Sequence, residues 1–277
     1  MTQELTIAFI GGGNMATALA AGLIGKRCGA HDVHVIDVNE SVLERWAQQG
    51  VTVASSPDAT LAARRVWILA VKPQYLKAAV ESCRPFLQDD TLVISIAAGI
   101  SAATISQWLG SDEHPWTRLV RCMPNTPALI GSGASGLMAL SGVSPDDKTV
   151  AQQLMRAVGE VVWVENDRQI DAVTALSGSG PAYVFLFLES LIQGGIEQGL
   201  SDDQARTLAL ATLTGATQLA ALSHENLATL RERVTSKGGT TAAALDVLYR
   251  EEFPGTIRQA MQAAHDRAAQ LADEFAK

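Results

Sequence analysis

The residues best suited to chemistry lie near the end of the chain, at positions 235–242, which read Thr-Ser-Lys-Gly-Gly-Thr-Thr-Ala. Helical patterns precede and follow this segment. Its two glycines free the backbone to bend, and Thr240 or Thr241 can cap the helix that follows. The free N–H groups at that helix start, with hydroxyl groups beside them, suit a small carboxylate. An ordinary capped turn between two helices fits the same residues, so both interpretations stay open at this point.

A second glycine-rich segment lies near the start of the chain. Residues 6–10 form a short apolar run typical of a buried strand, and Gly11-x-Gly13-x-x-Ala16 then opens an apolar helix. This is the dinucleotide-binding pattern, with alanine in place of the third glycine. Asp37 ends the next strand-like run, 21 residues after Ala16, near the spacing at which a carboxylate binds an adenosine ribose. The alternative is a strand–turn–helix unit without a ligand.

Composition narrows the class of protein. At 277 residues the chain is long for one compact core, so two domains are expected. Its net charge of -8 argues against nucleic acid or anionic membranes as partners. No positively charged segment precedes the first apolar run, and no uncharged run is a convincing membrane span, which places the protein in the cytoplasm.

The cysteines and histidines predict no metal site. Three widely spaced cysteines form no CxxC pair, which is typical of reduced and mostly buried thiols. The five histidines have no metal-ligand spacing.

Strand and helix patterns alternate in the first part of the chain, which we assign to a dinucleotide-binding domain at residues 1–165. The strand-like runs are 6–10, 33–37, 66–71, 92–96, 117–122, 136–140 and 161–164. The helix-like runs between them are 15–25, 40–49, 57–63, 73–87, 101–109 and 146–157. This alternation predicts an α/β fold with a Rossmann-like, doubly wound, mostly parallel sheet.

Strand patterns disappear from Asn166 onward, and residues 166–277 are predicted to form an all-helical domain. Its helix-like runs are 167–176, 181–199, 201–222, 226–233, 241–249 and 253–275. A small domain with such apolar helices often completes its core with another subunit. We therefore expect a homo-oligomer, either a dimer or a multiple of one.

Several loops fall where ligands bind in open α/β sheets, at the carboxyl ends of predicted strands. Lys72-Pro73 follows one strand, and the small residues Ala97-Ala98-Gly99 follow another and would let a flat nicotinamide approach the backbone. Asn125 lies in a turn made rigid by two prolines. The glycine-rich residues 177–183 are predicted as a loop between two helices. The loops contain no nucleophile–base pair, which suits hydride transfer to an imine.

In order, these loops resemble those of the pyrroline-5-carboxylate reductase family, the last enzyme of proline biosynthesis. The matching stretches are 9–16, 70–74, 95–99, 123–128, 176–185 and 234–245. They span nearly the whole chain, and the last two are far more specific than the dinucleotide pattern.

The resemblance implies NADPH- or NADH-dependent reduction of the cyclic imine L-1-pyrroline-5-carboxylate to L-proline. It places the substrate on the helical domain and implies a site shared across a dimer, with decamers in some members. The implied cofactor-binding residues are Gly11, Gly12, Gly13, Asn14, Met15, Asp37, Asn39, Ser56, Val71, Lys72, Pro73, Ala97, Ala98, Gly99 and Asn125. The implied substrate-binding residues are Glu225, Ser236, Gly238, Gly239, Thr240 and Thr241. The resemblance also makes Thr241 the catalytic residue, through its hydroxyl at the ring nitrogen.

Two features leave details open. Lys237 stands where the family usually has proline, and Asn226 stands in a loop that also departs from the family pattern. A carboxylate at Asp37 favours the ribose diol of NADH, whereas Asn39 and Arg45 could serve the 2′-phosphate of NADPH. The sequence thus leaves the cofactor as NAD(P)H.

Two other functions share part of this pattern. A β-hydroxyacid dehydrogenase also joins a dinucleotide domain to a helical one, but it needs a helix-borne lysine. From Asn166 onward the only lysines are Lys237, in a predicted turn, and the terminal Lys277. A non-catalytic NAD(P)-binding redox sensor would be expected to lose the glycine–threonine segment, which is complete here.

Overall fold

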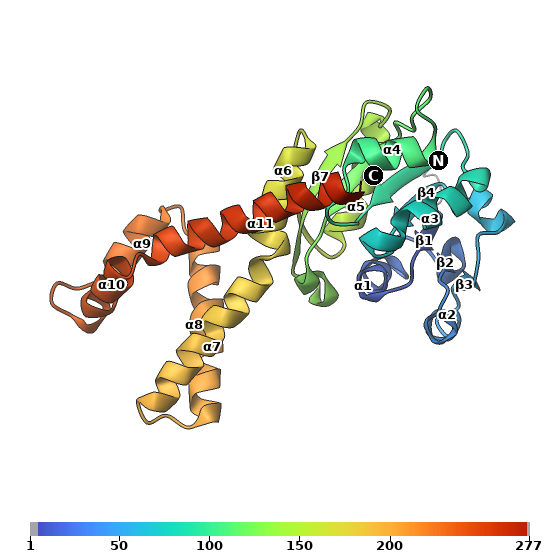
Figure 1. Cartoon of the computed structure of the whole chain (residues 1–277). Coiled ribbons are helices and arrows are strands. Elements are labelled where there is room, and N and C mark those ends of the chain that lie inside the picture. Colours follow the sequence, from blue (N-terminus) through green and yellow to red (C-terminus); the bar gives the residue numbers. More distant parts are fainter. Residues whose placement is uncertain (1–4, 276–277) are drawn as a thin grey trace. The chain divides into compact units, whose positions relative to one another are not determined.

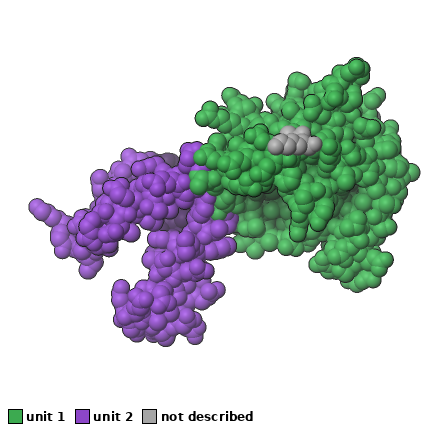
Figure 2. All heavy atoms as spheres, viewed as in Figure 1, with its two compact units in different colours: residues 1–179, 263–277 green, residues 180–262 purple. Residues whose placement is uncertain are grey.

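The computed structural model describes residues 5–275, and the chain forms two compact units (Figures 1 and 2). Unit 1 runs to Ser179 and resumes at Ala263, and unit 2 consists of residues 180–262.

Unit 1 is built on one eight-stranded sheet in the order β3-β2-β1-β4-β5-β6-β7-β8. The strands are β1 (Ile7–Ile10), β2 (Val33–Ile36), β3 (Thr52–Ala54), β4 (Val66–Leu69), β5 (Leu92–Ser95), β6 (Leu119–Met123), β7 (Gly133–Ala139) and β8 (Gly159–Trp163). Strands β1 to β6 pair in parallel, β7 is antiparallel to β6, and β8 is parallel to β7. The predicted mostly parallel, doubly wound sheet is confirmed.

Helices cover both faces of the sheet. Those of unit 1 are α1 (Asn14–Leu23), α2 (Glu40–Ala47), α3 (Pro73–Cys83), α4 (Ala102–Leu109), α5 (Pro145–Arg156) and α6 (Asp167–Val173). Alternate residues of β1 belong to different cores, because successive side chains of a strand point to opposite faces. Ile7 and Phe9 pack with buried residues of α1, α2 and α5, whereas Ala8 and Ile10 pack with those of α3, α4 and α6.

The other helices are short 3₁₀ turns of unit 1 and the α-helices of unit 2. The 3₁₀ turns are η1 (Ala30–Asp32), η2 (Ala59–Ala63), η3 (Arg84–Phe86) and η4 (Thr126–Ile130). The helices of unit 2 are α7 (Gly180–Glu197), α8 (Asp202–Leu222), α9 (Leu227–Arg233), α10 (Thr240–Arg250) and α11 (Phe253–Phe275), whose last part belongs to unit 1.

Three local predictions were wrong. The predicted helix at 57–63 is the 3₁₀ turn η2, which begins after Asp58 accepts a hydrogen bond from the Thr60 N–H. Strand β3 was missed because it has three residues and none of them is fully buried, so it carries no apolar run. Strand β7 begins at Gly133, three residues before the predicted start at 136, because its small first residues are not strand-like.

The predicted loop at 177–183 is also wrong. A π-helical turn, η5 (Thr174–Gly178), follows α6 directly, and the Ser179 N–H donates to the carbonyl of Thr174 five residues back at 2.8 Å. Helix α7 then begins at Gly180. The physical reason lies in Pro181, which has no N–H for the Ser177 carbonyl and so favours a local change of helical pattern.

The stretch Asp167–Glu197 is long and apolar enough to cross a membrane, judged by length and composition alone. Only 6% of its most apolar window is buried within the single chain. No other helix among residues 5–275 meets both criteria.

Unit 2 buries little of its own apolar surface. Among residues 180–262, all of which the structure describes, only Ala205 and Ala209 are buried. Large apolar side chains lie exposed along its helices, at Val184, Phe185, Leu186, Leu191, Leu208, Leu219 and Leu222. Exposed apolar surface of this extent marks an interaction surface, as predicted for an oligomer.

The three cysteines are free thiols. Cys83 and Cys122 are buried and Cys28 is partly buried. Burial raises the pKa of the Cys83 thiol to about 11. The thiols are therefore protonated and poorly reactive at neutral pH.

One buried carboxylate ties together the amino ends of two strands. Asp147, in the first turn of α5, accepts hydrogen bonds from Arg118 at 2.8 Å and Arg65 at 3.2 Å, next to β6 and β4. It also forms a capping box with Ser144. Burial disfavours the charged form, but the bonds from Arg118 and Ser144 outweigh it, so the pKa of Asp147 is lowered below 3.8.

This pKa predicts how Asp147→Asn affects stability. A lowered pKa stabilises the folded state above the ordinary value of 3.8, and this contribution is lost as the pH falls through the lower folded value. At pH 7 we expect the variant to lose roughly 3–5 kcal/mol, because it removes the buried carboxylate that pairs with Arg118 and Arg65. Urea unfolding between pH 3 and pH 7 measures the difference, which should shrink below about pH 4.

Asp146→Asn is the matched control for this experiment. Asp146 occupies the same helical turn, but its side chain is exposed. Its replacement should lower the free energy of unfolding by less than about 1 kcal/mol. Equal losses in the two variants would contradict the role given to Asp147.

Candidate cofactor and substrate sites

The turn after β1 leaves no room for a side chain at Gly11. This residue has φ of +99°, and a Cβ atom there would lie 2.8 Å from the backbone of Ala70 and Val71, after β4. The Gly11 N–H donates to the carbonyl of Ile36 at the end of β2, at 2.8 Å. The turn is therefore held against the carboxyl ends of both neighbouring strands.

Gly12 is held through both its N–H and its carbonyl. Its N–H donates to Oδ2 of Asp37 at 2.8 Å, and its carbonyl accepts a hydrogen bond from Nε1 of Trp46 at 3.0 Å. Trp46 is buried and stacks on Phe9 of β1, with ring centroids 6.0 Å apart. No role was predicted for Trp46, because its spacing in α2 carries no signal of this contact.

The start of α1 is suited to a pyrophosphate. Gly13 is the N-cap of the helix and supplies no side-chain cap, so N–H groups of the first turn stay free. A Cβ atom on Gly13 would meet nothing within 4 Å, which means that the backbone faces open space. Free N–H groups and an approachable backbone at a helix start fit a dinucleotide, which these residues could hold.

Other predicted cofactor residues follow neighbouring strands at the same edge of the sheet. Lys72 is exposed and precedes α3, with Pro73 at the first helical position. Ser56 is exposed in the bend that follows β3. Ala97 and Gly99 are buried in the turn after β5, and Gly99 has φ of +67°; a Cβ atom there would lie 2.8 Å from Cβ of Leu271.

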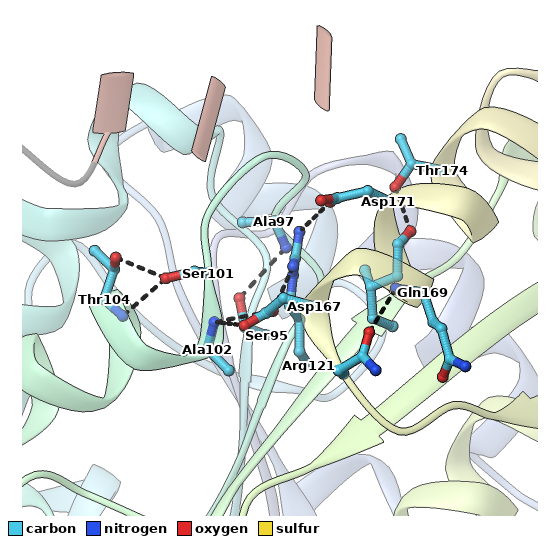
Figure 3. A network of polar contacts seen from close by, with 12 residues as sticks. Ser95, Ala97, Ser101, Ala102, Thr104, Arg121, Asp167, Gln169, Asp171 and Thr174 are labelled. Carbon is cyan, nitrogen blue, oxygen red and sulfur yellow. Dashed lines mark hydrogen bonds and ion pairs between the residues drawn. The ribbon is translucent and has the colours of Figure 1, made fainter. Parts of the chain in front are cut away.

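A buried arginine holds this last turn to α6 (Figure 3). Arg121 of β6 is 1% exposed and forms ion pairs with Asp167 and Asp171 of α6. Asp167 also accepts a hydrogen bond from the Ala102 N–H at the start of α4, whose N-cap is Ser101. The cluster therefore links β6, α6 and the helix that follows the Ala97–Gly99 turn.

The charges in this cluster depend on one another. Burial raises the pKa of Asp171, and the neighbouring Asp167 carboxylate raises it further, whereas Arg121 opposes both effects. Removing the arginine would leave two carboxylates close together with no cation from β6. The cluster was not predicted, because Arg121 lies 46 and 50 residues from its two partners in the sequence.

Asn125 uses both ends of its amide inside unit 1. Its Oδ1 accepts a hydrogen bond from the Ala134 N–H of β7 at 2.8 Å, and its Nδ2 donates to the Ser177 carbonyl at 3.0 Å. That carbonyl lacks a helical partner because Pro181, four residues on, has no N–H. Asn125 therefore joins β7 to the π-helical turn, and its predicted role in binding the cofactor stays a prediction.

The predicted substrate residues lie in unit 2, around the start of α10. Gly238 has φ of +70°, and Gly239 is the N-cap, so the expected capping by Thr240 or Thr241 is wrong. Both threonines lie inside the first turn of the helix. Gly239 offers no side chain to the first-turn N–H groups, so these stay available to a carboxylate.

Glu225 precedes this segment and is tied to α9. Its carboxylate forms an ion pair with Arg233 at 2.6 Å, and its N–H donates to Oγ of Ser223. Lys237 and Ser236 are exposed in the turn before α10. Among residues 5–275, no group of three or more histidine, cysteine, aspartate or glutamate side chains is placed to hold a metal ion.

Comparisons with known proteins agree with this arrangement. Residues 167–271 match the family model described as pyrroline-5-carboxylate reductase dimerisation, and residues 6–99 match the model described as NADP oxidoreductase, coenzyme F420-dependent. The pyrroline-5-carboxylate reductase of Pseudomonas aeruginosa is 42% identical over 97% of this chain and 97% of its own length. The chain belongs to the pyrroline-5-carboxylate reductase family.

Solved structures of reductases from this family have the same fold. The enzyme of Coxiella burnetii has a TM-score of 0.89 at 37% identity, over 98% of this chain and 99% of that one. The Plasmodium falciparum pyrroline carboxylate reductase, solved with NADP bound, has a TM-score of 0.86 at 27% identity, over 98% and 100%. The dimerisation match includes α7 and α8, which carry most of the exposed apolar side chains named above.

Asn125 offers a test of the contacts in this family member. Asn125→Ala leaves the Ala134 N–H and the Ser177 carbonyl without their partner, so we expect it to lower the free energy of unfolding by about 1–3 kcal/mol. Asn125→Asp keeps an acceptor for Ala134 but places a carboxylate oxygen against the Ser177 carbonyl, so it should lose at least as much. Thermal and urea unfolding measure both.

Thr126→Ala is the control, because Thr126 is the next residue and its side chain is exposed. It should change the free energy of unfolding by no more than about 0.5 kcal/mol. An Asn125→Ala variant as stable as the parent chain would contradict the conclusion that Asn125 stabilises the fold by joining β7 to the π-helical turn.

Proposed function

We propose that this chain reduces L-1-pyrroline-5-carboxylate to L-proline with NADPH or NADH. The similarity to pyrroline-5-carboxylate reductases over 97% of the chain is the observation that carries the proposal. The glycine turn after β1 and the uncapped start of α10 support it from the chemistry of the residues.

The substrate is an anion with a polarised C=N bond. The first-turn N–H groups of α10, with Ser236, Gly238, Gly239 and Thr240, bind its carboxylate, and Glu225 contributes from the preceding loop. The helix dipole favours the negative charge at this end of α10, which has 11 residues. Binding through the carboxylate fixes the orientation of the ring.

Thr241 acts on the ring nitrogen. Reduction adds a hydride to the imine carbon and a proton to the nitrogen, and the bound nicotinamide supplies the hydride. The Thr241 hydroxyl donates a hydrogen bond to that nitrogen and relays the proton from water as the secondary amine forms. Positioning and electrostatics then account for most of the rate, because the polarised imine accepts hydride readily.

The dinucleotide is held in unit 1. The residues proposed for it are Gly11, Gly12, Gly13, Asn14, Met15, Asp37, Asn39, Ser56, Val71, Lys72, Pro73, Ala97, Ala98, Gly99 and Asn125. Their support is the free helix start at α1 and the position of the other loops after strands of the same sheet.

Residues 1–165 act as the dinucleotide-binding domain and residues 166–277 as the substrate-binding and dimerisation domain of a cytoplasmic enzyme. It works as a dimer or a pentamer of dimers, without nucleic acid or membrane partners.

The exposed apolar helices of unit 2 and the dimerisation match support the dimer. Light scattering of the purified chain should give at least twice its 29.3 kDa, and a mass of one chain would contradict this.

Loss of reduced-nicotinamide absorbance tests the activity directly. We expect oxidation of NADH or NADPH with pyrroline-5-carboxylate and none with a 3-oxo acid. Thr241→Ala should lower kcat roughly 100-fold, with cofactor affinity unchanged, because it removes the only proposed donor to the nitrogen.

Thr241→Ser is the matched control, since it keeps the hydroxyl and should retain most of the activity. Turnover of the 3-oxo acid alone would replace the proposed reaction with that of a hydroxyacid dehydrogenase. A normal rate in Thr241→Ala would remove Thr241 from the mechanism and leave the reaction intact.

A further inference from the structure

The side chain of Asp37 is held in one orientation at the carboxyl end of β2. Oδ2 accepts a hydrogen bond from the Gly12 N–H at 2.8 Å, and Oδ1 accepts one from the Asn39 N–H at 2.9 Å. The backbone is fixed as well, because the Asp37 N–H donates to the Ala54 carbonyl of β3. The carboxylate therefore cannot turn away from the glycine turn without losing a hydrogen bond.

The fixed carboxylate still has acceptor capacity. An ionised carboxylate offers about four lone-pair positions, of which the two backbone N–H groups occupy two. The remaining positions can accept hydrogen bonds from the two hydroxyls of an adenosine ribose. A 2′-phosphate in its dianionic form has no proton to donate to the carboxylate. Both groups are negatively charged, so the carboxylate also repels the phosphate.

The segment that follows contains no cation to offset that repulsion. Residues 37–41 read Asp-Val-Asn-Glu-Ser and contain two carboxylates and no cation. Asn39 is the N-cap of α2, and its Oδ1 accepts hydrogen bonds from the N–H and the hydroxyl of Ser41. The Ser41 hydroxyl is thereby directed at Asn39.

Arg45 is the basic residue of α2, and its Nε is directed along its own helix. It donates to the carbonyl of Ser41, one turn back, at 3.4 Å. A cation in the last turn of a helix also complements the dipole at that end. Arg45 thus has a local role in α2 that needs no phosphate.

We propose that Asp37 makes this chain prefer NADH to NADPH. This proposal rests on the proposed function, because that function makes NADH and NADPH the ligands to compare. It concerns only how the adenosine end of the cofactor binds. Gly12 and Asn39 act as positioning residues, because their N–H groups hold the carboxylate, and Trp46 holds Gly12 in turn.

Calorimetry with the full chain tests the preference independently of turnover. The ligands are ADP-ribose and its 2′-phosphate, which lack the nicotinamide, together with NADH and NADPH. We expect each ligand without the 2′-phosphate to bind at least about tenfold more tightly than its phosphorylated partner. Equal binding, or tighter binding of the phosphorylated ligands, would overturn the proposal whatever the enzyme reduces.

Two variants assign the preference to Asp37. Asp37→Asn and Asp37→Ser remove the charge and should reduce the ratio of affinities to within about threefold, mainly by strengthening binding of the phosphorylated ligands. Glu40→Gln is the matched control, because it removes a neighbouring carboxylate that faces no Gly12 N–H, and it should keep the parent ratio. A ratio that persists in both Asp37 variants would overturn the assignment.

The parent chain alone tests the preference, so the proposal stays testable if a variant does not fold. Binding that distinguishes the two cofactors without any turnover of the imine would leave this inference standing and remove the proposed reaction. Turnover of the imine with equal affinities for the two cofactors would leave the proposed reaction standing and remove this inference.

Discussion

The close approach of backbone at Gly11 is the constraint on which the cofactor edge of unit 1 depends. A side chain there would overlap the peptide between Ala70 and Val71, so β1 and the loop after β4 meet at this distance only with glycine. The same turn is bonded to the end of β2 through Ile36 and Asp37. Three strands that come from different parts of the chain are thereby brought to a common edge, and α1 begins from that edge with its N–H groups free.

A second constraint is the single positive charge buried in β6. Arg121 needs counter-charges that the sheet does not supply, and Asp167 and Asp171 of α6 provide them. Buried ion pairs add little net stability compared with apolar side chains, but breaking one leaves an unpaired charge at high cost. The effect of the cluster is to fix where α6 lies on the sheet and, through Asp167 and Ala102, where α4 begins. The turn Ala97–Gly99 lies between β5 and α4, so its position depends on both.

The alternating apolar runs were enough to predict most of the sheet, because strands such as β1, β4 and β5 are buried on both faces and have few other interpretations. Asp37 could be located because the dinucleotide pattern fixes its distance along the chain. The contacts of Trp46, Asn125 and Arg121 could not, since each joins segments between 34 and 52 residues apart that have no local signal. The π-helical turn could not be predicted for the same reason. Pro181 indicates that a helical hydrogen bond is lost, but only the fold brings Asn125 close enough to donate to the Ser177 carbonyl.

The N-cap of α10 is a glycine rather than a threonine, and this choice affects the N–H groups of the first turn. A serine or aspartate there would bond to the N–H groups of the first turn, whereas glycine leaves them free and loses only a few tenths of a kcal/mol of helix stability. Gly238, with φ of +70°, turns the chain into the helix, and a Cβ atom on Gly239 would lie 2.5 Å from Oγ of Ser236. Only Gly238 is required by the backbone, because Gly239 has an ordinary φ of -83° and its clash is with a serine hydroxyl that can rotate. The uncapped N–H groups follow from the absence of a side chain at the N-cap. A helix start without a side-chain cap can bind a carboxylate without first giving up a hydrogen bond of its own, and it presents the hydroxyl of Thr241 from the same turn.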